Sequence, residues 1–251
     1  MAEIQFKSTI DVEEIQHVGD DLTIFAAAKV LHPEDYRRLY KNDPNPTDPT
    51  KLLGFLIEKR HGTPFEHGLL TVHVHAPIKV WREWHRHRVG MALHEDGLDF
   101  SFNEESGRYK RLEPVFYIPP PERPMIRPEG FRSMDPSFEL ADPQTHKIVT
   151  NYMKECYGIT YASYEHLLGL GVDRGLARDV LGVGIYSACW VTANPRSIMS
   201  FLELRTNCPE AKRPSKPLWE IDNAARQLET IFARYWPITW RLWNENGRMA
   251  P

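Results

Sequence analysis

The chain has 251 residues, of which 41% are hydrophobic and 26% charged, and its formal net charge is −3. A chain of this length can bury a sizeable core, and its slightly acidic balance argues against a dedicated nucleic-acid-binding or anionic-membrane protein. There is no apolar run long enough to cross a bilayer and no visible secretory signal. The three cysteines are too few and too scattered for a disulfide framework. We therefore expect a cytoplasmic protein without membrane or nucleic-acid partners.

Hydrophobic periodicity in the first half predicts helices and one strand. The segments with such a pattern are helices over 22–31, 51–60 and 78–86, and a strand over 69–76. Asp20 or Asp21 can cap the first helix, and Pro33 is expected to stop or redirect it. A polar loop over 61–67 lies between the second helix and the strand, where loops often carry functional groups.

The second half continues with alternating helices and extended segments. We expect strands over 112–118 and 182–193, and helices over 143–170, after Asp173, over 195–205 and over 217–235. Asn194 is placed as an N-cap with Pro195 at the first helical position. A proline-rich stretch up to about 136 and the segment 206–216 are expected to be irregular. The whole chain, 1–251, is predicted to form one helix-rich domain of mixed α and β structure with a mixed sheet.

Two short segments carry groups that suit anions. The first is Arg86-His87-Arg88, which has no acidic residue within it, and the second is residues 104–108, which offers serine, glycine and arginine together. An arginine presents a fixed fork of donors that matches phosphate oxygens, and a glycine lets the backbone approach a ligand closely. The two segments together indicate a nucleotide, or two.

These segments and their surroundings resemble the flavin-dependent thymidylate synthases. That family carries R-H-R, then seven residues and a serine, usually as R-H-R-x-x-S-x-N-E-x-S-x-R-Y, and here R-H-R stands at 86–88 and S-F-N-E-E-S-G-R-Y at 101–109. Further matching segments follow the family order: A-A-K-V at 27–30, H-G-T-P-F-E-H at 61–67, H-A-P-I-x-V at 75–80, F-Y-I-P-x-P-E-R at 116–123, L-A-R at 176–178, N-P-R-S-I-M-S-F-L-E-L-R at 194–205 and W-E-I at 219–221.

The resemblance implies a mixed α/β fold, a homotetramer with active sites shared between subunits, and tightly bound FAD. It also implies a reaction in which a methylene group passes from methylenetetrahydrofolate to C5 of dUMP, reduced flavin supplies the hydride, and NADPH restores the flavin. The family uses no cysteine nucleophile at C6. None of the three cysteines here stands in the proline-cysteine-histidine context of the classical enzymes.

The same resemblance assigns cofactor-binding residues, and each has a local alternative. The assigned residues are Thr63, Glu66, Arg86, His87, Arg88, Asn103, Glu104, Asn194, Arg196 and Ser200. For Thr63 and Glu66 the alternative is helix capping and a surface turn. The R-H-R segment is otherwise a solvated basic helix end, and Asn194 is otherwise only an N-cap. Ser200 stands where the family commonly has asparagine.

A second set is assigned to the nucleotide. Its members are Glu83, Arg86, Glu104, Glu105, Ser106, Gly107, Arg108, Arg178 and Arg205. Arg108 and Arg178 are expected on the phosphate. Arg205 is the expected catalytic residue, because its family counterpart binds the uracil edge and a fixed guanidinium stabilises a developing oxyanion. The local alternatives are a turn closed by Ser106, an ion pair of Arg178 with an acid such as Asp179, and a cation at a helix C-terminus for Arg205.

The sequence departs from the family pattern close to the expected pyrimidine site. Residues 89–105 separate Arg88 from Ser106, which is ten residues more than the family spacing, and the extra residues fit 91–100. The segment 206–216 is also longer than usual and lacks a common histidine. Glu83 replaces a usual glutamine. These departures lead us to expect that UMP is accepted besides dUMP, with Glu83 accepting a hydrogen bond from a ribose hydroxyl.

Two other classes of function remain open at this point. A metalloenzyme is conceivable from the histidine pairs His73/His75 and His85/His87, but acidic partners at metal spacing are missing and helical residues two apart diverge. We expect no metal. The other class is a non-catalytic flavin- or nucleotide-binding regulatory protein that has lost the chemistry of its family.

Overall fold

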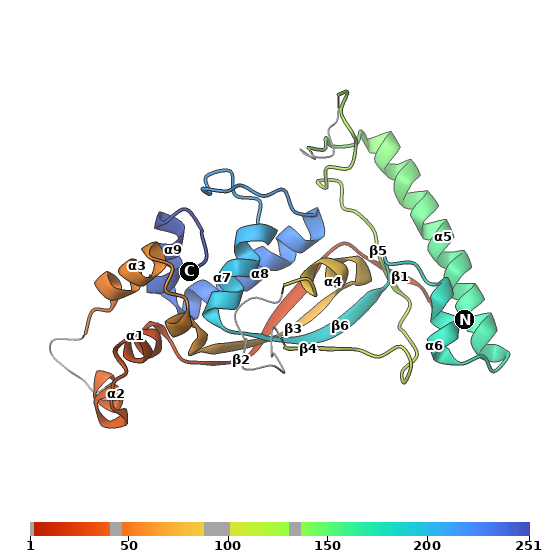
Figure 1. Cartoon of the computed structure of the whole chain (residues 1–251). Coiled ribbons are helices and arrows are strands. Elements are labelled where there is room, and N and C mark those ends of the chain that lie inside the picture. The colour runs from red at the N-terminus through yellow and green to blue at the C-terminus, as the bar shows by residue number, and fades with distance from the viewer. Residues whose placement is uncertain (1–2, 41–46, 88–100, 131–136) are drawn as a thin grey trace. The chain divides into compact units, whose positions relative to one another are not determined.

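The computed structural model describes residues 3–40, 47–87, 101–130 and 137–251 (Figure 1). Contacts within the chain group it into two units. The first consists of Met1–Asp11, Val74–Trp84 and Asn103–Cys189, and the second of Val12–His73, His85–Phe102 and Trp190–Pro251. The expectation of a single domain stays a prediction, and each unit is described separately below.

In the first unit a long helix covers a small aromatic core. Helix α5 (Pro143–Gly169) begins at Asp142, whose side chain accepts hydrogen bonds from the backbone N–H groups of Gln144 and Thr145. Strands β1 (Gln5–Lys7) and β5 (Val115–Tyr117) pair in parallel. The buried residues of this core are Leu112, Phe116, Tyr161, Tyr164, Ala177 and Ile185. The remaining helical elements are α4 (Ile78–Trp84), the single turn α6 (Arg174–Ala177) and the 3-10 turn Arg178–Val180.

A four-stranded sheet has the strand order β2-β3-β6-β4 and supplies residues to both units (Figure 1). Its strands are β2 (Asp11–Val18), β3 (Leu69–Pro77), β6 (Tyr186–Ala193) and β4 (Ser101–Glu104). The N-terminal half of β3 and the C-terminal half of β6 meet through the Thr71 and Thr192 hydroxyls, whose oxygens lie 3.0 Å apart.

The second unit is mainly helical. Its helices are α1 (Asp21–Lys29), α2 (Pro33–Leu39), α3 (Thr50–Glu58), α7 (Pro195–Arg205), α8 (Trp219–Tyr235) and α9 (Pro237–Glu245), with a 3-10 turn at Thr63–Glu66. Asp20 and Thr23 form a capping box at the start of α1. The buried Asp21 carboxylate accepts hydrogen bonds from the backbone N–H groups of Ile238 and Thr239 and from the Thr239 hydroxyl. This carboxylate therefore anchors the first turn of α9, although α9 is more than two hundred residues away in the chain.

The mixed α/β class is confirmed, and several strongly periodic segments form the elements expected of them. The main differences are elements that the sequence pattern did not reveal: β1, β2, β4, α2 and α9. Strand β2 is largely exposed and so lacks a buried face that would produce clear alternation. Pro33 begins α2 rather than ending a helix, since proline suits the first helical position. Helix α8 starts at Trp219, two residues later than expected. Helix α4 ends at Trp84, two residues earlier than expected. Over the described parts of the chain, no helix combines the length and apolarity that crossing a membrane requires.

Candidate active site

The last residue of α7, Arg205, meets His87 within the second unit. Arg205 Nε donates a hydrogen bond to His87 Nε2 at 2.7 Å, and the His87 ring packs edge-on against Phe201 with ring centroids 5.0 Å apart. Burial, followed by the positive charges of Arg205 and Arg86, lowers the pKa of His87 to about 4. At neutral pH His87 is therefore uncharged, carries its proton on Nδ1 and accepts at Nε2. A neutral imidazole thus holds the guanidinium of the expected catalytic residue.

At the other end of α7, Arg196 is held between two acceptors. Its Nη1 donates to Glu66 Oε1 at 2.5 Å, and its Nε donates to the Pro251 carbonyl oxygen at 3.1 Å. A Cβ atom built on Gly62 would lie 2.3 Å from Arg196 Nε. Since real Cβ atoms do not approach so closely, Gly62 is required for this placement of the guanidinium. The structure thus brings together Arg196 and Glu66, two of the residues assigned to the cofactor.

Asn194 caps α7 from a buried position. Its Oδ1 accepts a hydrogen bond from the Ser197 N–H at 2.8 Å, which confirms the N-cap expected from the sequence. Ser197 is completely buried, and its hydroxyl has no hydrogen-bond partner among the residues that the structure describes. A buried hydroxyl without a partner is costly in free energy, and a bound ligand or water would satisfy it.

In the first unit, Glu104 at the end of β4 is fixed by a neighbouring strand. Ser187 Oγ on β6 donates to Glu104 Oε1 at 2.8 Å, and Ser187 is only 2% exposed. Burial and the negative charge of Glu104 raise the pKa of the Cys189 thiol to about 12. Cys189 therefore stays protonated at neutral pH, which makes it a poor nucleophile.

The next residue, Glu105, is engaged within the chain. Its side chain forms an ion pair with Lys110 at 2.8 Å, and its backbone N–H donates to the Ala188 carbonyl at 2.7 Å. The hydrogen bond and charge of Glu105 raise the pKa of Lys110. Glu105 thus fastens the start of the turn that follows it to β6, and its carboxylate already has a cationic partner.

The turn Ser106–Tyr109 lies next to a second arginine of the assigned set. A Cβ atom built on Gly107 would lie 3.3 Å from Cδ of Arg178, so the absence of a side chain at Gly107 lets the Arg178 stem lie against the turn. Arg108, inside the turn, has its guanidinium carbon 5.6 Å from the centroid of the Tyr109 ring. Both arginines are exposed, and in the described residues neither guanidinium has an acidic partner, Asp179 included. Two cations at this turn, one within it and one beside it, that have no acidic partner among the described residues suit an anionic ligand.

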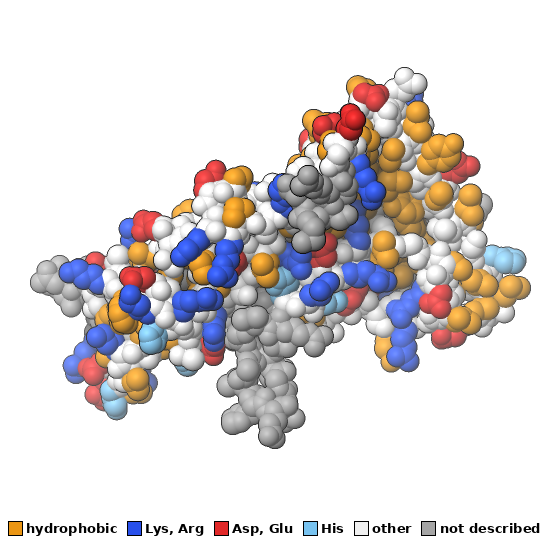
Figure 2. All heavy atoms as spheres, turned by 45° about the horizontal axis from the view of Figure 1, so that its top comes forward, with side chains coloured by type: hydrophobic (Ala, Val, Ile, Leu, Met, Phe, Trp, Pro, Cys, Tyr) orange, Lys and Arg blue, Asp and Glu red, His pale blue; other side chains and the backbone are white. Residues whose placement is uncertain are grey.

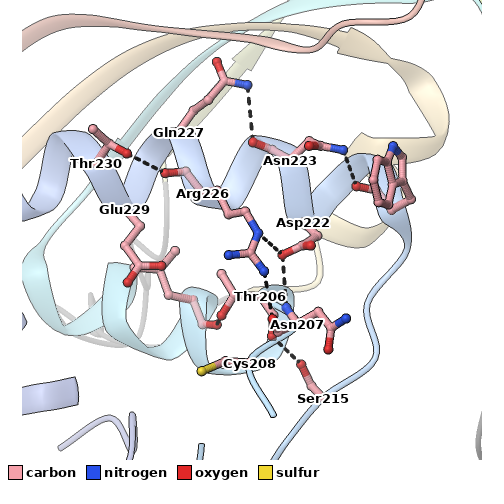
Figure 3. Close-up of polar contacts among 12 residues, drawn as sticks. Thr206, Asn207, Cys208, Ser215, Asp222, Asn223, Arg226, Gln227, Glu229 and Thr230 are labelled. Carbon is pink, nitrogen blue, oxygen red and sulfur yellow. Dashed lines mark hydrogen bonds and ion pairs between the residues drawn. The ribbon is translucent and has the colours of Figure 1, made fainter. Parts of the chain in front are cut away.

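The segment after Arg205 is anchored by side chains from α8 and from the C-terminal region. Figure 3 shows Arg226 between Asp222 and the carbonyl of Asn207, with Nη2 donating to that carbonyl at 2.8 Å. Ser215 Oγ donates to the carbonyl of Thr206 at 3.1 Å. Although the segment 206–216 lacks regular structure, as expected, its two ends are thus fixed by hydrogen bonds.

A buried ion pair lies beneath this segment. Arg248 donates to both carboxylate oxygens of Glu229, at 2.7 and 2.8 Å, and to the Thr206 hydroxyl at 3.0 Å. Burial alone would raise the pKa of Glu229, but the hydrogen bonds from Arg248 and Trp240 outweigh it and lower the pKa. Thr206, Asn207, Cys208, Arg226, Glu229 and Arg248 are among the residues that line a cavity of about 490 Å³ here.

The assigned site residues separate by unit. Thr63, Glu66, Arg86, His87, Asn194, Arg196, Ser200 and Arg205 lie in the second unit, and Glu83, Asn103, Glu104, Glu105, Ser106, Gly107, Arg108 and Arg178 lie in the first. Arg88 and the extra segment 91–100 fall outside the described residues. Most of the cofactor set thus belongs to one unit and most of the nucleotide set to the other.

The sequence alone does not reveal which residues hydrogen-bond to the side chains assigned to the site. Ser187 beside Glu104, and the pairing of His87 with Arg205, depend on contacts between segments 83 and 118 residues apart. The only signal in the sequence was that Ser187 lies on a segment expected to be extended. The histidine pairs considered for a metal do not assemble one: no three His, Cys, Asp or Glu side chains gather at metal spacing in the described ranges.

The chain matches proteins of one family along most of its length. Residues 15–238 fit the family model described as thymidylate synthase complementing protein. The chain is 40% identical over 248 residues to a flavin-dependent thymidylate synthase of Streptomyces coelicolor, covering 99% of this chain and 96% of that one. It is 35% identical over 249 residues to the enzyme of the same name from Tropheryma whipplei, covering 98% of this chain and 97% of that one.

A solved structure with a similar fold is that of a UMP/dUMP methylase, PolB, from Streptomyces cacaoi bound with 5-Br UMP. It has a TM-score of 0.86 and 34% sequence identity, and it covers 99% of this chain and 99% of that one. The same methylase bound with 5-Br dUMP matches with a TM-score of 0.85. These relatives confirm the expected class of enzyme and its flavin, and they do not favour a non-catalytic protein. The chain belongs to the family of flavin-dependent thymidylate synthases.

Proposed function

We propose that this chain methylates C5 of a uridine monophosphate, taking the carbon from methylenetetrahydrofolate and reducing equivalents from NADPH through FAD. The observation that carries the proposal is the pair of arginines Arg108, in the Ser106–Tyr109 turn, and Arg178, whose stem lies against that turn; their charges have no acidic partner in the described residues. A nucleotide phosphate is the anion that such a pair suits.

The residues of the second unit fit an FAD molecule. Arg86 and Arg196 are donors to phosphate or to the flavin ring oxygens, and His87 adds a neutral ring with an N–H donor. Among the residues that the structure describes, the buried Ser197 hydroxyl has no hydrogen-bond partner, which supports a polar ligand at the start of α7. We propose that Thr63, Glu66, Arg88, Asn103, Glu104, Asn194 and Ser200 complete the cofactor site. When bound in its reduced form, the flavin supplies the hydride.

Arg205 is proposed to act on the pyrimidine. Because the neutral His87 accepts its Nε–H, the guanidinium keeps one orientation without losing its charge. A fixed cation facing a pyrimidine carbonyl stabilises negative charge as it develops on that oxygen, which makes C5 the nucleophilic carbon. In this proposal Arg205 binds and polarises the base, while Arg108 and Arg178 hold the phosphate.

We propose that UMP is a substrate besides dUMP. The 34% identical methylase PolB is described with both 5-Br UMP and 5-Br dUMP bound. Glu83, near the end of α4, is half-buried, and its carboxylate can accept a hydrogen bond from a ribose 2′-hydroxyl. Glu104, Glu105, Ser106 and Gly107 complete the proposed nucleotide site.

A homotetramer with shared active sites is also proposed. Helix α5 exposes Ile148, Tyr152 and Ile159, with 48%, 66% and 61% of their surfaces accessible. Figure 2 shows hydrophobic side chains gathered on this side of the first unit. These residues recur at helical spacing on one side of α5, and an apolar stripe of this kind is typical of a helix that packs against a further helix.

The test is turnover with dUMP and UMP side by side, each with methylenetetrahydrofolate and NADPH, followed by tritium release from the C5-labelled nucleotide. We expect a yellow protein whose released cofactor is FAD, bleaching by NADPH, and tritium release from both nucleotides. A protein that takes up no FAD overturns the proposal as a whole. Turnover of dUMP without any of UMP overturns only the wider substrate range. Binding of FAD and dUMP without tritium release identifies a non-catalytic protein.

A further inference from the structure

The turn that carries Arg108 is fastened by a residue outside the assigned set. Arg174, the first residue of α6, donates from Nη1 to the Tyr109 carbonyl oxygen at 2.6 Å. Arg174 has no acidic partner in the described part of the chain. A guanidinium that bonds a neutral carbonyl keeps its full positive charge, so Arg174 adds a third cation to a site that already has Arg108 in the turn and Arg178 beside it.

The turn and α6 fit together through two glycines. The stem of Arg178 lies against Gly107, where a Cβ atom would be 3.3 Å from Cδ. In the reverse direction, the stem of Arg108 passes Gly175, where a Cβ atom would be 3.5 Å from Cγ and 2.7 Å from Asp173 Oδ2. Each of the two arginines is thus packed against the glycine of the opposite segment.

The α6 side of this contact is fixed independently of any ligand. Asp173 caps α6 by accepting from the Leu176 N–H at 3.1 Å, and Ala177 is completely buried in the core of the first unit. The turn side is closed by the Tyr109 N–H bond to the Ser106 carbonyl at 3.1 Å. The hydrogen bond from Arg174 joins α6 to the Ser106–Tyr109 turn. Because each of these segments is held by its own hydrogen bonds, the Arg174 bond fixes the position of the turn against α6.

We propose that Arg174 is a positioning residue for the nucleotide phosphate. By holding the Tyr109 carbonyl, it keeps the Ser106–Tyr109 turn on α6, so that Arg108 and Arg178 are presented to one phosphate group. Gly175 serves the same arrangement, because a Cβ atom there would lie 2.7 Å from Asp173 Oδ2 and would displace the carboxylate that caps α6. This inference rests on the proposed binding of a nucleotide phosphate at Arg108 and Arg178.

The test compares the binding of dUMP and of deoxyuridine, which lacks the phosphate, to the wild type and to Arg174→Gln. We expect the substitution to weaken dUMP binding by about tenfold or more, because small misplacements of binding groups cost that much. Binding of deoxyuridine is expected to be unchanged. In turnover, KM for dUMP rises while kcat changes little. Arg174→Lys retains a donor and a charge and is expected to recover part of the affinity.

Matched variants separate positioning from loss of folding. Arg241→Gln removes one exposed charge on α9 and is expected to leave dUMP binding unchanged. Gly175→Ala is expected to weaken dUMP binding, whereas Gly182→Ala, whose Cβ atom meets nothing within 4 Å, is not. If Arg174→Gln folds and binds dUMP as the wild type does, or loses deoxyuridine to the same degree as dUMP, the inference is overturned. If the wild type itself binds no dUMP, it is the proposed function that fails.

Discussion

Arg205 Nε donates to His87 Nε2 at 2.7 Å, and the two residues lie 118 positions apart in the chain. His87 belongs to the R-H-R segment expected to bind the flavin, and Arg205 is the expected catalytic residue. Because His87 is neutral, it acts as an acceptor and leaves the whole positive charge on Arg205. A protonated His87 would instead lose its acceptor and repel the guanidinium.

The first prediction concerns acid stability. The pKa of His87 is lowered to about 4 in the folded protein, below its ordinary value of 6.5, so between these values the unfolded chain binds a proton that the folded chain does not. The free energy of unfolding should therefore fall as the pH drops from 6.5 to 4, by at most about 3 kcal/mol, and this component should level off below pH 4. Urea denaturation over this pH range measures it.

The control for this prediction is a pair of substitutions. His87→Gln keeps a side-chain acceptor but cannot be protonated, so it should remove this part of the pH dependence. His166→Gln, on the exposed side of α5, should leave it in place. Equal pH dependence in all three proteins would contradict the role given to His87.

The second prediction distinguishes two roles of Arg205. Arg205→Lys keeps a positive charge at the C-terminus of α7 but loses the planar fork and the Nε donor to His87. If Arg205 polarises the pyrimidine, the rate of C5 tritium release should fall by about a hundredfold or more, while FAD content and melting temperature stay near those of the wild type. A variant that is fully active, or one that merely unfolds, would favour a structural role as a cation at the helix end.

The third prediction uses the close approach at Gly62. A methyl group at Gly62 would lie 2.3 Å from Arg196 Nε, so Gly62→Ala must displace the guanidinium from Glu66 and Pro251. We expect the purified variant to retain less FAD than the wild type, measured as the ratio of flavin to protein absorbance. Gly54→Ala is the control, since its methyl group would make an ordinary contact of 3.7 Å with Leu242. Equal flavin content in both variants would argue against Arg196 as a cofactor residue.

The fourth prediction concerns the buried pair Arg248–Glu229. Arg248→Met leaves the Glu229 carboxylate buried without its bidentate partner, and it removes a donor to Thr206. We expect the free energy of unfolding to fall by about 3–5 kcal/mol, as is usual when one member of a buried pair is removed. The double variant with Glu229→Gln should recover part of this loss, because the charge is gone. If the double variant is no more stable than Arg248→Met, an uncompensated charge is not the cause.

The sequence was most informative where the pattern is local. The pattern predicts both ends of helix α7, because Asn194, Pro195 and a run of apolar residues are adjacent in the chain. The mixed α/β class followed from several such segments together with the family resemblance. By contrast, β2 and α9 were missed. Strand β2 has no fully buried residue, so its sequence lacks the alternation that predicts a strand. The first turn of α9 is held by Asp21, a contact that cannot be read from the residues of α9 alone.

The same limit applies to the candidate site. The resemblance pointed to Arg178 and Gly107, but not to the packing of one against the other, because 71 residues separate them. Arg174 lies four positions before Arg178 and was overlooked, since nothing in the local pattern says that its donor reaches the Tyr109 carbonyl. Residues that bind a ligand can be recognised by a motif, whereas residues that hold them in place depend on the folded chain.

Helix α5 has 27 residues, of which only Thr150, Tyr161 and Tyr164 are buried. If four copies of the chain cover its exposed apolar stripe, their association favours the folded state by mass action, and the melting temperature rises with protein concentration. Enzyme diluted to nanomolar levels for kinetic assays would then differ from the micromolar stock in both assembly and lifetime. Diluted enzyme would then lose activity during the assay, which shows as early curvature in the progress curve. Adding an inactive variant with an intact α5 would restore a linear curve, because it restores the assembly.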